Sequence, residues 1–236
     1  MAPRPPAIRL EGVAYGWPGR AGFRLEVPAF RLEAGERALL LGPSGSGKST
    51  LLALIAGVAA AERGTVEVAG TDLARLSPAA RDRFRAERIG VVFQQFNLLP
   101  YATPLDNILL PLTFAPARRR RIGDRAARRA EALRLAAALG LPEPLVTRAA
   151  SAELSTGQQQ RVAVARALIG GPDLILADEP TSALDTAAQD AFLRLLAEQV
   201  AAVGAALLMV SHDERLAARF DRTLRLGDIL RAREAA

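Results

Sequence analysis

The stretch that decides the fold is Gly42-Pro-Ser-Gly-Ser-Gly-Lys-Ser49, with Thr50 after it. It matches the pattern G-x-x-x-x-G-K-[ST] and lies between a predicted strand at 38–41 and a predicted helix from Lys48 to about Gly57. Glycines let the backbone of such a loop curl, so that successive N–H groups point inward at phosphate oxygens. The N-terminus of the following helix adds a partial positive charge. The stretch therefore predicts a phosphate-binding loop.

The side chains of this loop indicate a nucleoside triphosphate held with magnesium. Lys48 would place a full charge on the β- and γ-phosphates, and the hydroxyl of Ser49 is a suitable ligand for Mg²⁺. Lys48 is the only lysine, since arginine supplies all the other basic positions. We expect ATP with Mg²⁺ as the bound group. The predicted nucleotide-binding residues of the loop are Gly42, Pro43, Ser44, Gly45, Ser46, Gly47, Lys48, Ser49 and Thr50.

A second segment, Leu174-Ile-Leu-Ala-Asp-Glu179, is an apolar strand that ends in two acids. In a protein with a phosphate loop, the first acid, Asp178, is placed to hold the magnesium shell. Glu179 is then placed to take a proton from an attacking water, a role typically worth about 10²–10⁴ in rate. We therefore predict Glu179 and Lys48 as catalytic residues, and Asp178 and Ser49 as metal ligands.

The segment Leu154-Ser-Thr-Gly-Gln158, called the signature segment below, precedes a predicted helix. Ser155 and Gln158 have the spacing of a capping box, so the segment could simply start a helix. It would also give the chain a second helix N-terminus suited to an anion. One nucleotide needs only one such cradle, so the second requires an explanation.

Composition limits the class of protein. The chain has 236 residues and no cysteine, which excludes disulfides, thiolate metal sites and a cysteine nucleophile. Its longest apolar runs have about eleven residues, whereas a membrane-spanning helix needs about 20. The N-terminus has no apolar segment behind its charge, so no secretory signal is expected and the chain is expected to be cytoplasmic. The net charge of +6 indicates either scattered solvated arginines or an anionic partner surface, and the run Arg118–Arg121 allows a solvated loop or a contact with acidic lipid.

Strand and helix patterns indicate an α/β fold. Strands are expected at 8–15, 23–27, 30–32, 38–41, 65–68, 89–93, 174–177, 206–210 and 223–226. Helices are expected from Ser77, over 124–140, near 186–203 and near 213–220. Alternation of strands and helices implies a largely parallel sheet with helices on its faces. We interpret 1–93 and 162–236 as a catalytic core with an N-terminal β subdomain, and 94–161 as an inserted helical subdomain.

The order of these motifs, with Gln94, Ser182-Ala-Leu-Asp185 and His212, resembles the ATP-binding subunits of ABC transporters along essentially the whole chain. The resemblance implies a single domain with a P-loop NTPase core of the RecA-like kind. It gives Tyr15 the role of stacking on adenine, with Trp17 as a rival. It makes Gln94 a ligand of Mg²⁺ and places His212 on the γ-phosphate as a catalytic residue. Further residues that it assigns to the nucleotide are Ser155, Gly157, Gln158 and Asp185. The signature segment departs from the usual form at Thr156, which puts its local geometry in doubt.

The same resemblance implies partners. Two copies would pack head to tail, with each ATP between the phosphate loop of one and the signature segment of the other. ATP hydrolysis would drive an integral membrane permease on a separate chain, at the cytoplasmic face of the inner membrane. Phe93–Pro100 and Asn107–Pro111 are similar to the lipoprotein-releasing and macrolide-export subfamily. The alternative is a soluble ABC ATPase acting on nucleic acid or ribosomes. Because this chain has one cassette and no cysteine for zinc modules, we expect no nucleic-acid partner.

Overall fold

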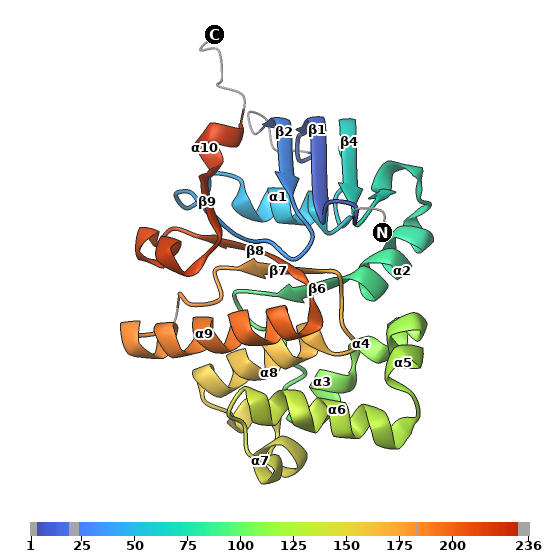
Figure 1. Cartoon of the computed structure of the whole chain (residues 1–236), viewed down its shortest axis with the longest axis vertical. Helices are drawn as coiled ribbons and strands as arrows, with labels where there is room; N and C mark the ends of the chain where they lie inside the picture. The colour runs from blue at the N-terminus through green and yellow to red at the C-terminus, as the bar shows by residue number, and fades with distance from the viewer. Residues whose placement is uncertain (1–3, 19–23, 183, 231–236) are drawn as a thin grey trace. The chain divides into compact units, whose positions relative to one another are not determined.

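A computed structural model describes residues 4–18, 24–182 and 184–230. The chain forms two compact units (Figure 1). Unit 1 combines Met1–Arg85 with Ala206–Ala236, and unit 2 is Ala86–Ala205. The predicted helical subdomain, 94–161, falls within unit 2, together with two strands that flank it.

Unit 1 begins with an antiparallel sheet in the order β2-β1-β4-β5. Its strands are β1 (Ile8–Tyr15), β2 (Leu25–Leu32), β4 (Arg63–Val68) and β5 (Thr71–Asp72). On β1, Ile8, Leu10 and Val13 are buried and Arg9 and Glu11 are exposed. This alternation gives the strand one core face, interrupted at Gly12, where the register with β4 shifts.

The two strands predicted at 23–27 and 30–32 are one strand, β2, so the prediction of a break was wrong; Phe23 lies outside the described residues. Pro28 lies between the two predicted segments. Proline has no N–H to give to a ladder, and it is tolerated on edge strands for that reason. β2 is the edge of this sheet, and Pro28 is exposed. The strand therefore continues through the proline.

The second sheet of unit 1 is parallel. β3 (Arg37–Leu41) pairs on one side with β8 (Ala206–Ser211) and on the other with β9 (Arg222–Arg225). Every residue of β8 is buried, as is β3 apart from Arg37, which is the near-continuous apolar pattern of a covered parallel sheet. The helical elements that begin in unit 1 are α1 (Lys48–Ile55), η1 (Leu73–Arg75), α2 (Pro78–Arg88), η3 (Glu214–Arg219) and α10 (Leu226–Ile229). The predicted helix at 213–220 is the 3₁₀ helix η3.

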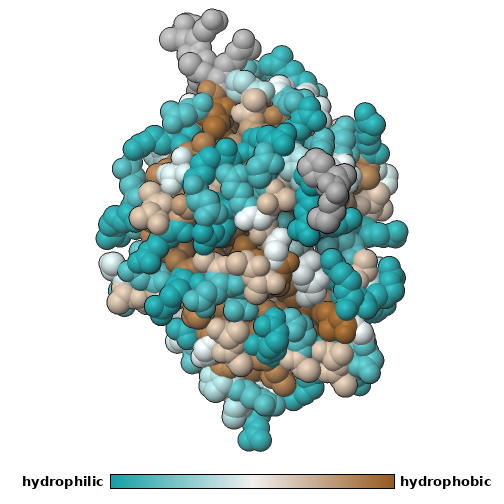
Figure 2. Space-filling view, viewed as in Figure 1, coloured by the Kyte–Doolittle hydropathy of each residue, from teal (hydrophilic) through white to brown (hydrophobic). Residues whose placement is uncertain are grey.

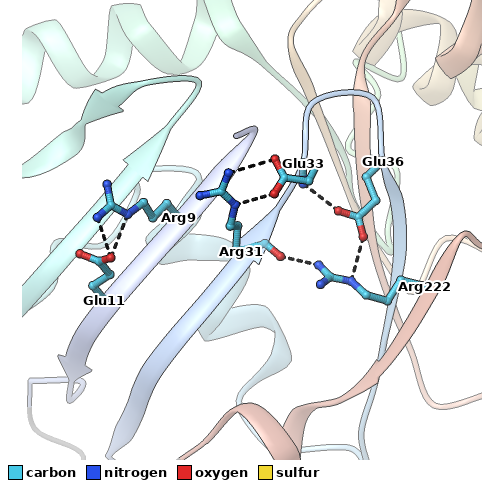
Figure 3. A network of polar contacts seen from close by, with 6 residues as sticks. All are labelled: Arg9, Glu11, Arg31, Glu33, Glu36 and Arg222. Atoms are coloured by element: carbon cyan, nitrogen blue, oxygen red, sulfur yellow. Dashed lines mark hydrogen bonds and ion pairs between the residues drawn. The ribbon is translucent and has the colours of Figure 1, made fainter. Parts of the chain in front are cut away.

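Polar contacts join the two sheets of unit 1 (Figure 3). Arg222 of β9 pairs with Glu36 at 2.8 Å and also donates to the carbonyl oxygen of Arg31 on β2. Glu36 in turn accepts a 2.7 Å hydrogen bond from the backbone of Glu33, which closes the turn before β3. Exposed ion pairs of this kind contribute at most about 1 kcal/mol each, so the network mainly fixes the turn.

Unit 2 contains the parallel pair β6 (Ile89–Val92) and β7 (Leu174–Asp178), in register from Ile89 with Leu174 to Val92 with Ala177. Its helical elements are α3 (Pro104–Leu109), α4 (Pro111–Phe114), α5 (Pro116–Ile122), α6 (Arg125–Ala138), α7 (Glu143–Arg148), η2 (Ser151–Glu153), α8 (Thr156–Leu168) and α9 (Thr186–Val203). Helix α8 packs against β6, α3, α6 and α9. The approach to β6 is close, because a Cβ on Gly90 would lie 2.3 Å from the carbonyl oxygen of Ala167. Helix α8 is thus central to unit 2.

The face shown in Figure 2 is mainly hydrophilic, with small hydrophobic patches between charged side chains. The large apolar side chains exposed within the described residues are Trp17, Val58, Phe93, Tyr101 and Phe114. No helix in the described ranges is long and apolar enough to span a bilayer.

Candidate functional site: a phosphate loop and the residues that accompany it

The phosphate loop (residues 42–50) lies in unit 1 between β3 and α1, as the sequence predicts. Two of its glycines need backbone angles that other residues rarely adopt, with φ of 78° at Gly45 and 108° at Gly47. Gly42 is required for space, because an added Cβ would lie 2.9 Å from the Oγ of Ser46. The glycine spacing is therefore set by the curl of the loop.

Lys48 points its ammonium into this loop. Its Nζ donates to the carbonyl oxygens of Gly42 at 2.7 Å and Pro43 at 3.0 Å, and the side chain is buried. The positive charge of the ammonium, held at the loop by these carbonyl oxygens, favours an anion there. The Oγ of Ser46 is also buried and has no hydrogen-bond partner in the described part of the chain. A triphosphate would supply acceptors to both groups, which fits ATP.

His212 follows the strand next to this loop. Leu41 of β3 pairs with Ser211 of β8, and the N–H of Gly42 donates to the carbonyl oxygen of Ser211 at 3.2 Å. The hydroxyl of Ser211 accepts from the N–H of Asp213 at 3.1 Å, which fixes the turn at the end of β8. His212 itself is exposed. Because the strands are parallel, the phosphate loop and His212 emerge at the same edge of the sheet.

The two candidate base-stacking residues contact each other. The rings of Tyr15 and Trp17 meet edge to face, with centroids 5.1 Å apart at 85°. Tyr15 is 7% exposed and Trp17 is 36% exposed. The indole Nε1 of Trp17 donates to the hydroxyl of Thr50 at 3.0 Å. Burial, followed by the charge of Glu62, raises the pKa of the Tyr15 phenol, which therefore stays neutral at pH 7. The structure links Trp17 to the phosphate loop, a contact that the sequence did not reveal.

In unit 2, β7 ends at Asp178, and Glu179 follows with φ of 44°. This left-handed conformation costs a residue with a side chain about 1–3 kcal/mol and tends to occur at functional sites. The turn after it is closed by the N–H of Ser182, which donates to the carbonyl oxygen of Glu179 at 3.2 Å. The Nε2 of Gln160, from α8, donates to the carbonyl oxygen of Pro180. The backbone around Glu179 is therefore held from both sides.

Gln94 lies on an exposed turn directly after β6, called the glutamine loop below (residues 93–97). The N–H of Phe96 donates to the carbonyl oxygen of Phe93 at 3.1 Å. Phe96 and Asn97 are both left-handed, with φ of 54° and 50°. Their carbonyl oxygens accept from the guanidinium of Arg166, at 2.6 Å for Asn97.

The signature segment forms the start of α8, and the capping box is present. The Oγ of Ser155 accepts from the N–H of Gln158 at 3.3 Å, and the N–H of Ser155 donates to the Oε1 of Gln158 at 2.9 Å. A Cβ on Gly157 would meet nothing within 4 Å, so packing within this chain does not require glycine there. Thr156 is the exposed first residue of the helix. Asp185 similarly caps α9, its Oδ1 accepting from the N–H of Ala188 at 2.8 Å.

The ABC transporter family matches residues 25–182. The chain belongs to this family. It is 44% identical over 226 residues to the lipoprotein-releasing system ATP-binding protein LolD of Novosphingobium aromaticivorans, which covers 94% of this chain and 97% of that protein. It is 41% identical over 206 residues to the macrolide export ATP-binding/permease protein MacB of Rhodopirellula baltica, covering 86% of this chain and 29% of that protein.

A solved ABC structure agrees with the fold. The dimeric post-hydrolysis state of the ATP-binding cassette MJ0796, bound to ADP and Pi, has a TM-score of 0.80 and 34% identity, and covers 92% of this chain and 93% of that chain. The predicted α/β fold of a P-loop NTPase, with an antiparallel sheet and a parallel sheet with helices, is confirmed. The chain is an ATP-binding and ATP-hydrolysing subunit of the ABC transporter class, as predicted.

Sequence reasoning about this ABC subunit missed the buried polar residues of unit 2. The run Arg118–Arg121 was interpreted as a solvated loop or a lipid contact, but it lies in helix α5 and Arg118 is 1% exposed. Its guanidinium donates to the carbonyl oxygens of Ala86, Ala167 and Ile169, and burial lowers its pKa to about 10. Arg118 therefore caps the C-terminal end of α8. A run of four arginines carries no signal that one of them is buried.

Proposed function

We propose that this ABC subunit works as a pair of copies arranged head to tail, and that ATP binding and hydrolysis by the pair drive a separate membrane permease. The observation that carries the pairing is the second anion-suited helix start at Ser155. Gly157 beside it has no packing role in its own chain, which fits a surface kept open for a phosphate of another copy. The solved MJ0796 cassette bound to ADP and Pi is a dimer, which supports the pairing.

Within each site we assign the residues as follows. Lys48 and the N–H groups of the phosphate loop hold the phosphates, and His212 approaches the γ-phosphate from the same sheet edge. Ser49, Gln94 and Asp178 would hold Mg²⁺, which neutralises charge on the β- and γ-phosphates when it is bound. Oxygens of the bound phosphates and water would fill the remaining positions, as is usual for Mg²⁺ in nucleotide sites. Glu179 takes the proton of the attacking water, and Tyr15 stacks on adenine.

We assign the permease to the type used in lipoprotein, macrolide or peptide export. The relatives named for lipoprotein release match this chain along nearly its whole length, whereas the macrolide-export relative is named as an ATP-binding and permease protein in one chain. Because the lipoprotein-releasing relative of Novosphingobium, named as an ATP-binding protein, is matched over 97% of its length, we assign the permease to a second polypeptide and this subunit to the cytoplasmic face of the inner membrane.

Affinity capture tests the proposal. The tagged Glu179→Gln variant, supplied with ATP, is recovered from detergent-solubilised membranes, and the co-purifying proteins are identified by mass spectrometry. We expect one polytopic membrane protein, absent when the bait is the Lys48→Ala variant. The net charge of +6 motivates the rival, action on nucleic acid or ribosomes. Capture of ribosomal components, with ATP hydrolysis stimulated by RNA in a steeply salt-dependent way, would contradict the permease assignment.

A further inference from the structure

Helix α8 carries more than the signature segment. We propose that two buried side chains of α8, Gln160 and Arg166, are positioning residues that hold the Glu179 turn and the glutamine loop in their working conformations. This proposal rests on the roles given above to Glu179 and Gln94. It adds a physical connection between those two loops and the helix that begins at Ser155.

Gln160 is the contact to the Glu179 turn. It is 1% exposed, and its Nε2 donates to the carbonyl oxygen of Pro180, the residue after Glu179. Pro180 has no backbone N–H of its own, so its carbonyl oxygen is the one backbone hydrogen-bonding group of this residue, and Gln160 fixes it. Because Glu179 is left-handed and strained, its conformation persists only where the surrounding structure holds it. Gln160 supplies that hold from α8.

Arg166 is the contact to the glutamine loop. It lies six residues after Gln160, about 9 Å further along the axis and on another side of the helix. Its buried guanidinium donates to the carbonyl oxygens of Phe96 and Asn97, the two consecutive left-handed residues that follow Gln94 and Gln95. The planar fork of arginine reaches the two neighbouring carbonyl oxygens with two separate nitrogens in fixed geometry, whereas lysine has a single nitrogen on a flexible chain. Burial lowers the pKa of Arg166, yet arginine remains charged at pH 7.

The far end of α8 is fixed as well. Arg118 donates to the carbonyl oxygens of Ala167 and Ile169, at the last turn and just beyond it. The helix is therefore held at its C-terminus while its N-terminus presents Ser155 and Gly157. A force on the signature segment acts on one helix about 20 Å long that contacts both loops. Binding of a phosphate at the signature segment would therefore change the positions of Gln94 and Glu179 together.

The absence of cysteine from the chain allows a direct test. A spin label on Gln95→Cys, an exposed position in the glutamine loop, reports the mobility of that loop by electron paramagnetic resonance. The label is compared in the Arg166→Met, Arg166→Lys, Gln160→Met and Arg161→Met backgrounds. Arg161 lies on the same helix and serves as the matched control. We expect a more mobile label with Arg166→Met, a smaller change with Arg166→Lys, and the unchanged spectrum with Gln160→Met and Arg161→Met.

Kinetics of the unlabelled variants complete the test. Arg166→Met and Gln160→Met should each lower kcat by about 10- to 100-fold, because small misplacements of catalytic groups cost that much, while the Kd for ATP stays within about threefold. Arg161→Met should change neither. The proposal would be overturned if the label spectra of both Arg166 variants were the same as that of the labelled parent chain. It would also be overturned if kcat were unchanged in both Arg166→Met and Gln160→Met. The label readout needs no hydrolysis, so it remains decisive even if Glu179 proves not to be the base.

Discussion

The backbone N–H of Gly42 donates a hydrogen bond to the carbonyl oxygen of Ser211 across 3.2 Å. This bond extends the pairing of β3 and β8 by one step, from the last strand residue into the phosphate loop. The first residue of the loop is thereby fixed to the residue that precedes His212. Lys48 then donates back to the carbonyl oxygen of Gly42. The loop, its lysine and the histidine consequently depend on the geometry of a single parallel sheet.

Gly42→Ala tests how tightly the loop is built. The added methyl group would lie 2.9 Å from the Oγ of Ser46, and overpacking of this kind costs about 1–3 kcal/mol. We expect a lower Tm and a Kd for ATP raised by about tenfold or more in calorimetric titrations. Gly227→Ala is the control, because a Cβ there meets nothing within 4 Å in helix α10, and it should leave both quantities unchanged or raise Tm slightly. Equal effects of the two substitutions would refute the steric argument.

Tyr15→Ala and Trp17→Phe separate the two aromatic residues. Loss of a stacking aromatic costs about 1–3 kcal/mol per base, so Tyr15→Ala should weaken ATP binding about 5- to 150-fold. Trp17→Phe removes only the hydrogen bond to Thr50, and we expect a loss of less than about tenfold. Calorimetric titration with ATP and with inorganic triphosphate measures both. The Tyr15 effect should vanish with triphosphate, and a larger effect of Trp17→Phe on ATP binding would make Trp17 the stacking residue.

Arg118→Met tests the cap on α8. The substitution removes a charged donor and leaves the carbonyl oxygens of Ala167 and Ile169 buried without it, so the free energy of unfolding should fall by at least about 2 kcal/mol. The neighbouring Arg119 is exposed, so Arg119→Met should change the free energy of unfolding by less than about 0.5 kcal/mol. Chemical denaturation of the two variants gives the comparison. Similar values for the two would mean that burial of Arg118 contributes nothing.

The pair of Arg37 and Asp221 gives a pH-dependent contribution to stability. The hydrogen bond from Arg37, at 2.5 Å, lowers the pKa of Asp221 below its ordinary value of 3.8. A lowered pKa stabilises the folded state at pH values above the ordinary carboxyl pKa, and that stability is lost as the pH falls through the lowered value. Asp221→Asn should therefore be less stable at pH 7 by no more than about 1 kcal/mol, because the pair is partly exposed.

The difference between Asp221→Asn and the wild-type chain should close progressively below about pH 4. Chemical denaturation of both proteins at a series of pH values from 3 to 7 measures this difference in the free energy of unfolding. A difference that stays constant across that range would show that the pair is not the cause.

Sequence reasoning succeeds where chemistry and backbone geometry coincide in consecutive residues. The glycines at 42, 45 and 47 and the capping pair of Ser155 and Gln158 are readable because their spacing sets the local backbone, and Asp178 and Glu179 come at the end of a strand whose apolar run marks it. The apolar runs at 23–27 and 30–32 predict two strands, and only the pairing of β2 with β1 from Leu25 to Leu32 shows that they are one. Local signals therefore predict local structure well.

The contacts of α8 could not be predicted in the same way. Gln160 and Arg166 contact carbonyl oxygens 20 and about 70 positions away in the chain, and a backbone carbonyl leaves no mark in the sequence. Arg118 is hidden among three exposed arginines for the same reason. The left-handed conformations of Glu179 and Phe96 likewise depend on tertiary contacts, since neither position is glycine.

Phosphate release by the Glu179→Gln variant is the most direct test of the central claim, that this chain uses Glu179 to activate water against ATP held by the phosphate loop. The purified variant and the purified wild-type chain are each given saturating ATP and magnesium, and the affinity of each for ATP is measured in parallel. The variant should bind ATP about as tightly as the wild-type chain and dimerise on it, while steady-state phosphate release slows by about 10²–10⁴. A variant that releases phosphate at close to the wild-type rate would contradict it.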